Sequence, residues 1–366
     1  MAEHTVLLLP GDGIGPEVTR EAVRVLGAIA QTQGIAFRFP EAPIGGAAID
    51  RVGMPTPPET LEACRAADAI LFGAVGGPRW DGLPPDRRPE RGLFDLRRTL
   101  AVFANLRPVR AMESLIDASP LRAERVRGTD LMIVRELTGG IYFGEPRSLS
   151  EEEAVDTLRY RREEIVRVAR VAFTLAQQRR RRVTSVDKAN VLASSQLWRA
   201  VVEHEARQFR DVVLEHMLVD TCAMQLVRAP ASFDVILTEN MFGDILSDEA
   251  AGVVGSIGLL PSASLGATPP ALYEPVHGSA PDIAGQGVAN PLGAILSAAM
   301  MLRHSFGLDL EAALVEDAVV RVLQQGIRPP DLGGSASTVE MGQSVAAAIL
   351  HHDETLSRAR AGRRGP

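Results

Sequence analysis

The apolar residues of this chain alternate between short continuous runs and longer stretches with helical spacing. Thr5–Leu9, Ala69–Phe72 and Phe233–Thr238 are short apolar runs, which are typical of strands buried on both faces of a sheet. Helical spacing follows the first run as far as Ala30 and recurs over Glu163–Gln178. The apolar face of this last stretch consists of Ile165, Val168, Ala169, Ala172 and Leu175. Strands that alternate with helices predict an α/β fold with an open, largely parallel sheet.

Length and composition indicate a folded protein with more than one core. A chain of 366 residues exceeds the size of one ordinary core, so two lobes are expected. Hydrophobic residues make up 46% of the chain and charged residues 23%, which argues against intrinsic disorder. The formal net charge of −7 gives no electrostatic reason to expect a nucleic acid partner. An anionic substrate would therefore need a local cluster of basic side chains.

One basic run, Arg179–Arg182, follows the long helical stretch. A nucleic-acid-binding patch would explain it, and salt-sensitive retention on DNA or RNA would test that interpretation. A cationic helix C-terminus, stabilised by the helix macrodipole, explains the same residues without a ligand. The second interpretation is favoured.

The N-terminus contains no targeting signal. The first residues, MAEHTVLLLPGDG, hold neither a basic leader nor a long apolar run, and no stretch of the chain predicts a transmembrane span. Cys64 and Cys222 lack the spacing of a metal site, and Cys64 falls in a helical pattern that suits a small buried thiol. We expect a cytoplasmic protein with no membrane partner.

The glycines after the first strand suggest a dinucleotide-binding fingerprint, but the match is incomplete. The run Gly11-Asp12-Gly13-Ile14-Gly15-Pro16 has proline where the pattern G-x-G-x-x-G requires its third glycine. No convincing strand that ends in an acidic residue follows at the usual distance. We therefore predict that this loop does not bind a pyrophosphate and that the fold is not a classical Rossmann fold.

The polar stretch Glu274–Pro291, EPVHGSAPDIAGQGVANP, is the most informative motif in the chain. Composition alone favours a surface loop. Its glycines would let backbone N–H groups approach a ligand, and the carboxylate of Asp282 can accept both hydroxyls of a ribose. The run HGSAPDIAG resembles the adenosine-ribose loop of the decarboxylating β-hydroxyacid dehydrogenases, the isocitrate and 3-isopropylmalate dehydrogenase family.

This resemblance implies a nicotinamide cofactor. Asp282 would repel a 2′-phosphate, and no Lys or Arg lies between Gly278 and Ala289 to bind one, so NAD is favoured over NADP. The segment Gly77–Glu90 is expected to cover the nicotinamide side. The cofactor-binding residues implied by the resemblance are Gly77, Glu90, His277, Gly278, Ser279, Ala280, Pro281, Asp282, Ile283 and Asn290.

Two aspartates form the candidate metal site. Asp244 and Asp248 are four residues apart after the strand-like run, so their carboxylates project from one helical face. Such a pair is most often solvent-exposed, but FGDILSD matches the family's metal motif without a gap. The family also supplies a third ligand from the neighbouring subunit, which corresponds to Asp220. Mg²⁺ or Mn²⁺ is the expected ion.

A stripe of mixed chemistry forms the candidate anion clamp. Glu90, Leu93, Phe94 and Arg97 have the spacing i, i+3, i+4 and i+7, so they share one helical face. That face suits a cleft that holds an anion beside a hydrocarbon branch. With Arg107 and Arg135, Arg97 makes three guanidiniums, which resemble the family's malate-carboxylate contacts.

The resemblance also assigns the proton-transfer residues. Tyr142 in GGIYFGEPR and Lys188 in SVDKANV match the family's catalytic acid and base, and Asn190 matches a substrate contact. In the family, Lys188 and Asp220 would enter the active site of the partner subunit, which requires at least a homodimer. Taken singly, a tyrosine after Gly-Gly usually packs in the interior and a lysine is usually solvated.

The resemblance covers the chain nearly from end to end and implies a two-lobed isopropylmalate dehydrogenase-like fold with open sheets flanked by helices. Residues 1–102 plus 255–366 would form the cofactor-binding lobe, and residues 103–254 would form the lobe with the dimer interface and metal site. The active-site cleft would lie between the lobes.

The implied activity is NAD-dependent oxidative decarboxylation of 3-isopropylmalate in leucine biosynthesis. Leu93 and Phe94 favour this acid over isocitrate, because hydrocarbon side chains offer nothing to a third carboxylate. Relatives specific for isopropylmalate more often have two leucines here, so Phe94 leaves the accepted branch size open. Isocitrate, homoisocitrate and tartrate or malate remain alternatives. A non-catalytic regulatory subunit is the alternative of another class, although such a chain should have lost part of this residue set.

Overall fold

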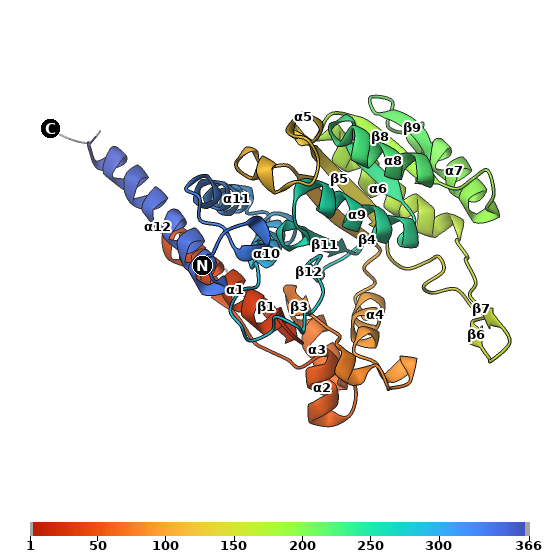
Figure 1. The fold of residues 1–366 in the computed structure, drawn as a ribbon, viewed down its shortest axis with the longest axis horizontal. Coiled ribbons are helices and arrows are strands. Elements are labelled where there is room, and N and C mark those ends of the chain that lie inside the picture. The colour runs from red at the N-terminus through yellow and green to blue at the C-terminus, as the bar shows by residue number, and fades with distance from the viewer. Residues whose placement is uncertain (1–2, 363–366) are drawn as a thin grey trace. The chain divides into compact units, whose positions relative to one another are not determined.

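The computed structural model describes residues 3–362, with side chains described as far as His351 (Figure 1). The chain forms two compact units. Unit 1 comprises Met1–Leu100, Ile257–Ala263 and Thr268–Pro366, and unit 2 comprises Ala101–Ser256 and Ser264–Ala267. The sequence prediction put the crossings near Val102 and Gly255. The structure puts them after Leu100 and Ser256, and it also assigns Ser264–Ala267 to unit 2.

The sheet of unit 1 is parallel where its pairings are described. Its strand order is β2-β1-β3-β12-β11, and β1 pairs in parallel with β2 and β3, as β12 does with β3. All six residues of β3 are buried, which explains its continuous apolar sequence. The strands are β1 Glu3–Gly11, β2 Ala36–Arg38, β3 Ala69–Ala74, β11 Pro261–Leu265 and β12 Ala271–Pro275, and β11 is divided between the two units after Ala263.

Seven α-helices belong to the described part of unit 1. Helix α1 packs against α10 and α12, and α10 also packs against β12. Pro16 lies in the first turn of α1, where backbone N–H groups have no acceptor within the helix, so its missing N–H costs no hydrogen bond. Gly34 ends the helix with a φ of 67°. The helices are α1 Gly15–Gln33, α2 Gly45–Val52, α3 Pro58–Ala66, α4 Glu90–Thr99, α10 Leu292–Phe306, α11 Asp309–Gln324 and α12 Thr338–Gly362.

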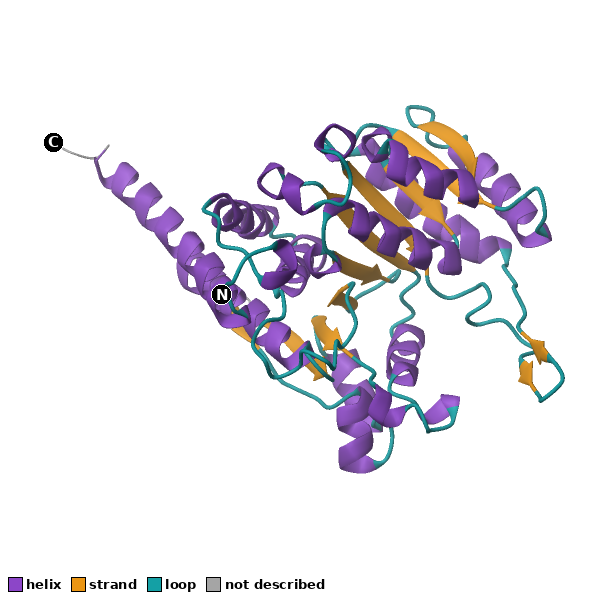
Figure 2. Cartoon of the chain, in the orientation of Figure 1, coloured by secondary structure: helices purple, strands orange, loops and turns teal. Residues whose placement is uncertain are grey.

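Unit 2 contains a mixed sheet and a small separate ribbon. The main order is β11-β4-β5-β10-β8-β9, in which β4 runs antiparallel to β5, and β5, β10, β8 and β9 pair in parallel. The two-stranded ribbon β6–β7 stands beyond the helices of unit 2 in Figure 2. The strands are β4 Ala104–Arg110, β5 Asp130–Glu136, β6 Ser148–Leu149, β7 Ala154–Val155, β8 Arg182–Asp187, β9 Val213–Leu218 and β10 Val235–Thr238.

Helices cover the unit 2 sheet. Helix α6 packs against β5, β8 and β10, and α9 packs against β4, β5 and β10. The apolar face predicted for the long helix is buried at Ile165, Val168, Ala169 and Ala172. The helices are α5 Ala123–Val126, α6 Arg162–Gln177, α7 Ala193–Ala206, α8 Val219–Arg228 and α9 Asn240–Val254. The alternation of strands and helices confirms the α/β class that the sequence predicted.

The favoured explanation of the basic run Arg179–Arg182 needs correction. Helix α6 ends at Gln177, so these arginines lie in the following turn and at the start of β8 rather than in the last helical turn. Arg179 is 2.9 Å from Asp234 and 2.8 Å from Asp130. Ion pairs with Asp130, the first residue of β5, and with Asp234, just before β10, therefore account for Arg179 rather than the macrodipole.

Across residues 3–362, none of the helices combines the length and apolar character needed to cross a membrane.

Candidate active site

Two predicted arginines lie on one face of the unit 2 sheet. Asn105 of β4 stands directly opposite Arg135 of β5, and Arg107 is two residues further along β4, so all three side chains project to the same side. Arg107 donates from Nε to Asn105 Oδ1 over 2.7 Å. Both guanidiniums are buried, with Arg107 6% exposed and Arg135 2% exposed. Buried guanidiniums require acceptors, and helix α9 supplies them.

Helix α9 presents one face to these arginines. Asn240, Gly243, Asp244, Ser247 and Asp248 follow the helical spacing i, i+3, i+4, i+7 and i+8. Gly243 lets the helix approach the sheet, because an added Cβ would lie 2.7 Å from Cγ of Arg135. Arg107 Nη1 donates to the hydroxyl of Ser247 over 2.6 Å. The glycine in the FGD motif is therefore a packing requirement of this site.

The two predicted metal-binding aspartates converge on the arginines. Arg107 reaches Asp244 over 3.5 Å and Asp248 over 3.6 Å, and Arg135 forms an ion pair with Asp244. The hydroxyl of Tyr142 donates to the other oxygen of Asp244 over 3.2 Å. The structure thus brings five predicted residues of unit 2 into one group.

Burial keeps the Tyr142 hydroxyl protonated. Burial is the main cause that raises the pKa of Tyr142, and the charge of Asp244 raises it further, while Arg135 opposes the shift. A tyrosine whose pKa is raised holds its proton throughout the neutral range. Its protonation state therefore suits a proton donor.

Lys188 and Asp220 form a second group in unit 2. Lys188 follows the end of β8, Asp220 lies in the first turn of α8, and their side chains make an ion pair of 2.6 Å. The hydrogen bond from Lys188 lowers the pKa of the Asp220 carboxyl. Asn190 is exposed in the turn between β8 and α7. In this chain, then, Lys188 contacts Asp220, whereas Tyr142 contacts Asp244.

The carboxylates of α9 fit a hard divalent cation. Asp244 and Asp248 project from the same face of α9, and both carboxylates reach Arg107. Mg²⁺ commonly takes one or two protein carboxylates and completes its octahedron with substrate and water. Within the described residues, His, Cys, Asp and Glu side chains form no group of three or more that could hold a metal.

In unit 1, the predicted stripe lies on α4, as its spacing required. Leu93 and Phe94 are partly buried and Glu90 is exposed, close to the turn at Gly76. Arg97 is buried and pairs over 3.2 Å with the buried carboxylate of Glu274. Its Nε has no hydrogen-bond partner among the described residues, so one donor remains for an anion.

The Arg97–Glu274 pair predicts a large stability effect. Glu274→Gln keeps the shape but leaves the buried guanidinium without a counter-charge, which is expected to lower the free energy of unfolding by about 3 kcal/mol. Urea-induced unfolding of both proteins measures the difference. Glu113→Gln, which breaks the exposed pair with Arg127, is the matched control and should change little. Equal losses in the two variants would contradict this assignment.

The predicted cofactor loop follows β12 and is anchored within unit 1. The carbonyl of Ser279 accepts from Ile14 N over 2.8 Å, and Glu17 accepts from Gly285 N over 2.5 Å. Thr338 also donates to the carbonyls of Gly287 and Ala289. Both ends of the unit 1 sequence thus hold this loop in place.

Several side chains in the loop remain available to a ligand. Nδ1 of His277 contacts the carbonyl of Gly278 at 2.9 Å, while its buried Nε2 has no hydrogen-bond partner among the described residues. Burial lowers the pKa of His277, which favours the neutral imidazole. Asp282 is exposed, and a Cβ added at Gly278 or Gly285 would meet nothing within 4 Å. These features fit a nucleotide. Asn290 is buried and donates to Asp331 over 2.9 Å.

Sequence reasoning missed one organising carboxylate of unit 1. Asp12 lies in the glycine loop after β1, where it accepts from the backbone N–H groups of Gly46, Ala47 and Gly76 at 2.7–2.9 Å. It thereby joins the N-terminus of α2 to the turn beside the predicted nicotinamide segment. A lone aspartate between glycines carries no pattern that would have indicated this role.

Comparison with known proteins agrees with this architecture. Residues 5–345 match the family described as Isocitrate/isopropylmalate dehydrogenase. The 3-isopropylmalate dehydrogenase of Geobacillus kaustophilus is 59% identical over 360 residues, covering 96% of this chain and 97% of the relative. The 3-isopropylmalate dehydrogenase of Aquifex aeolicus is 53% identical over 364 residues, covering 98% of this chain and all of the relative, 100%. A crystal structure of isocitrate dehydrogenase from Methylococcus capsulatus is similar with a TM-score of 0.84 and 35% identity, covering 95% of this chain and 99% of that one.

All of these similar proteins are dehydrogenases, and the fold and matches define the present chain as an oxidoreductase. More particularly, the chain belongs to the isocitrate/isopropylmalate dehydrogenase family. The resemblance inferred from the loop, the aspartate pair and the arginines is thereby confirmed. The fold expected from it, two-lobed rather than a classical Rossmann fold, is that of the family.

Proposed function

We propose that this chain catalyses the NAD-dependent oxidative decarboxylation of 3-isopropylmalate to 4-methyl-2-oxopentanoate and CO2, a step of leucine biosynthesis. The observation that carries the proposal is the extensive identity, 53–59% over nearly the full length, to relatives named 3-isopropylmalate dehydrogenase. The partly buried Leu93 and Phe94 support the same choice, because they would meet the isopropyl branch. Isocitrate would instead leave a carboxylate beside hydrocarbon, which is unfavourable.

Arginines would bind and orient the substrate's carboxylates. Arg107 and Arg135 are buried and preorganised by α9, so little side-chain entropy is lost when an anion displaces their present contacts. Arg97 offers its unpartnered Nε in the same way. Asn190 would contribute a further contact.

Asp244 and Asp248, with Asp220 of a second copy, would hold Mg²⁺ or Mn²⁺. When bound, the cation draws electron density from the substrate's hydroxyl and carboxylate oxygens, and NAD accepts the hydride. Lys188 of the second copy would take the hydroxyl proton as the C2 hydrogen leaves with its electron pair. After the bond to CO2 breaks, Tyr142, whose hydroxyl is protonated at neutral pH, would donate its proton to the carbon that carried the carboxylate.

The cofactor loop would bind NAD in preference to NADP. Asp282 would accept the ribose hydroxyls, and Ile283 would lie beside the ribose. His277 and Asn290, with the segment Gly278–Pro281, would line the rest of the adenosine side. Gly77 and Glu90 would lie on the nicotinamide side. Because Asp282 repels a 2′-phosphate, the affinity for NADP should be lower.

A substrate panel tests the proposal. With Mg²⁺, the protein is expected to reduce NAD on 3-isopropylmalate with a kcat/KM about 100-fold above that on isocitrate, homoisocitrate or tartrate, since the hydrocarbon contact discriminates against a carboxylate. A chelator should abolish the reaction, and added Mg²⁺ or Mn²⁺ should restore it. Preference for one of the other acids would overturn the substrate assignment, and undiminished activity after metal removal would overturn the metal site.

A further inference from the structure

Two of the hydrogen bonds of Arg135 go to one side chain that none of the sequence motifs singled out, Asn240. Nε and Nη2 of Arg135 both donate to Oδ1 of Asn240, over 3.0 and 2.8 Å. These two donors occupy one edge of the planar guanidinium, so Nη1 is directed to Asp244. Asn240 itself has an exposed fraction of 0%.

The other end of the same amide reaches the segment that carries Tyr142. Nδ2 of Asn240 donates to the carbonyl of Gly139 over 3.2 Å. Gly139 N donates in turn to the buried carboxylate of Glu136, over 2.8 Å. The backbone at Gly139 is therefore fixed from both sides, three residues before Tyr142.

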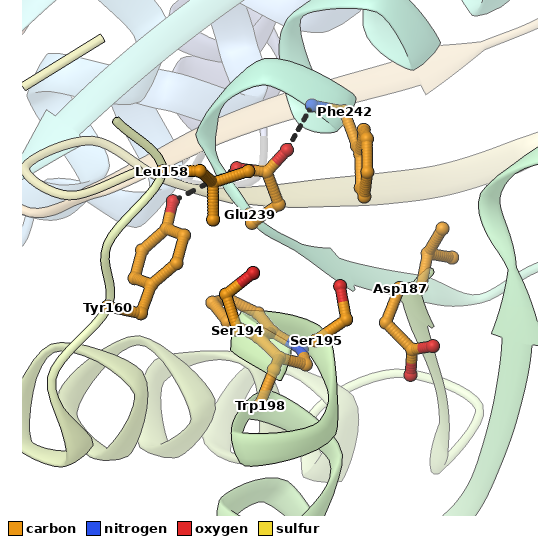
Figure 3. Close-up of a pocket in the computed structure, with 9 residues that line it drawn as sticks. Leu158, Tyr160, Asp187, Ser194, Ser195, Trp198, Glu239 and Phe242 are labelled. Atoms are coloured by element: carbon orange, nitrogen blue, oxygen red, sulfur yellow. Dashed lines mark hydrogen bonds between the residues drawn. The ribbon is translucent and has the colours of Figure 1, made fainter. Parts of the chain in front are cut away.

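The position of Asn240 is fixed as well. Its backbone N–H donates to the hydroxyl of Tyr160 over 3.0 Å, and this hydroxyl donates to Glu239 over 3.2 Å. The carboxylate of Glu239 also accepts from Phe242 N over 2.9 Å and so caps the N-terminus of α9. Figure 3 shows the hydroxyl of Tyr160 directed at the carboxylate of Glu239, and both residues line a small pocket.

We propose that Asn240 is a positioning residue for the reaction: its amide oxygen sets the orientation of Arg135, and its amide N–H ties that arginine to the loop that carries Tyr142. The amide supplies an acceptor for the guanidinium and a donor for the carbonyl on two different atoms of one small group. Leucine has the same shape and supplies neither. Aspartate keeps the acceptor but turns a charged oxygen toward the carbonyl of Gly139. The inference rests on the proposed function, because it assumes that Arg135 binds the substrate and Tyr142 protonates the product.

Steady-state kinetics of the full-length protein with 3-isopropylmalate, NAD and Mg²⁺ test the proposal. Asn240→Leu is expected to raise the KM for the acid about 10-fold and to lower kcat about 10-fold, while the KM for NAD stays within about twofold. Asn240→Asp should raise the KM for the acid less than Asn240→Leu does, yet still lower kcat. In an Arg135→Lys background, Asn240→Leu should add little to the KM for the acid, because the partner through which it acts is gone.

Thr129→Val is the matched control, since it removes a buried hydrogen bond of 2.6 Å in the same unit. It should lower the melting temperature without changing either KM. If Asn240→Leu changes neither KM for the acid nor kcat, or raises the KM for both substrates equally, the positioning role is wrong. Should that variant fail to fold, an unchanged kcat in Asn240→Asp would overturn the proposal. Wild-type protein that oxidises a different acid would refute the proposed substrate only, and the Asn240 variants would then be compared on that acid.

Discussion

Asp244→Asn is expected to lower kcat about 10³-fold at ordinary Mg²⁺ concentrations. Asparagine keeps the shape and one acceptor for Arg135, but it removes the negative charge that would bind the cation and that pairs with this arginine. A bound cation supplies several kcal/mol of charge stabilisation in the transition state, and each 1.4 kcal/mol corresponds to a factor of about 10 in rate. Titrating the variant with Mg²⁺ and Mn²⁺ measures how far the metal requirement has moved.

The metal titration distinguishes lost ligation from general damage. If Asp244 binds the ion, the variant should need far more metal than the wild type, and high metal should recover part of the rate. Glu249→Gln is the matched control, because it removes a carboxylate from the same helix, and its kcat should stay within about twofold. A metal requirement equal to that of the wild type in Asp244→Asn would refute the metal assignment.

The elements that could be predicted from the sequence are those whose signal is local. The continuous apolar runs correspond to β1, β3 and β10, whose central residues are buried and which pair in parallel with both neighbouring strands. Asp244 and Asp248 lie on one face of α9, because residues four apart are always neighbours on the surface of a helix. The same helical spacing places Leu93, Phe94 and Arg97 on one face of α4.

The contacts that organise the site could not be predicted, because they join residues far apart in the sequence. Asn240 and Arg135 form hydrogen bonds although they are 105 residues apart in the sequence, and Arg97 and Glu274 form one although they are 177 residues apart. Neither pair has a spacing that periodicity can reveal. The prediction for the basic run Arg179–Arg182 was wrong for a related reason. Its local pattern suggested the end of a helix, whereas Arg179 pairs with Asp234, which is 55 positions away in the sequence.

Part of the predicted site was assigned to a second copy of the chain. The sequence assigned Lys188 and Asp220 to the active site of a partner only through family resemblance. In the structure these residues pair with each other on β8 and α8, while Tyr142 pairs with Asp244 on α9. An active site shared between two subunits would require these two pairs to be separate within one chain. The separation also makes such sharing testable, because one residue of each pair can be changed in a different chain.

Mixed dimers are expected to regain activity when one chain carries Lys188→Ala and the other Asp244→Asn. Each homodimer should be nearly inactive, because the first lacks its base, worth about 10²–10⁴-fold in rate, and the second lacks a metal ligand. In the mixed dimer, one site combines Asp244 from the first chain with Lys188 from the second and is intact. Dimers isolated with two different affinity tags should therefore show about half the wild-type kcat per dimer, because two-fold symmetry gives two equal sites.

A second mixed dimer makes this test specific. Tyr142 donates to Asp244 within one chain, so these two residues serve the same site. Combining Tyr142→Phe with Asp244→Asn leaves one defect in each site, and no activity should return. Recovery with the Lys188 pair but not with the Tyr142 pair can arise only if Lys188 crosses to its partner. Absence of recovery in verified Lys188 mixed dimers would mean that each chain uses its own lysine, and unit 2 would then have to bring Lys188 to Asp244 by a rearrangement of its own.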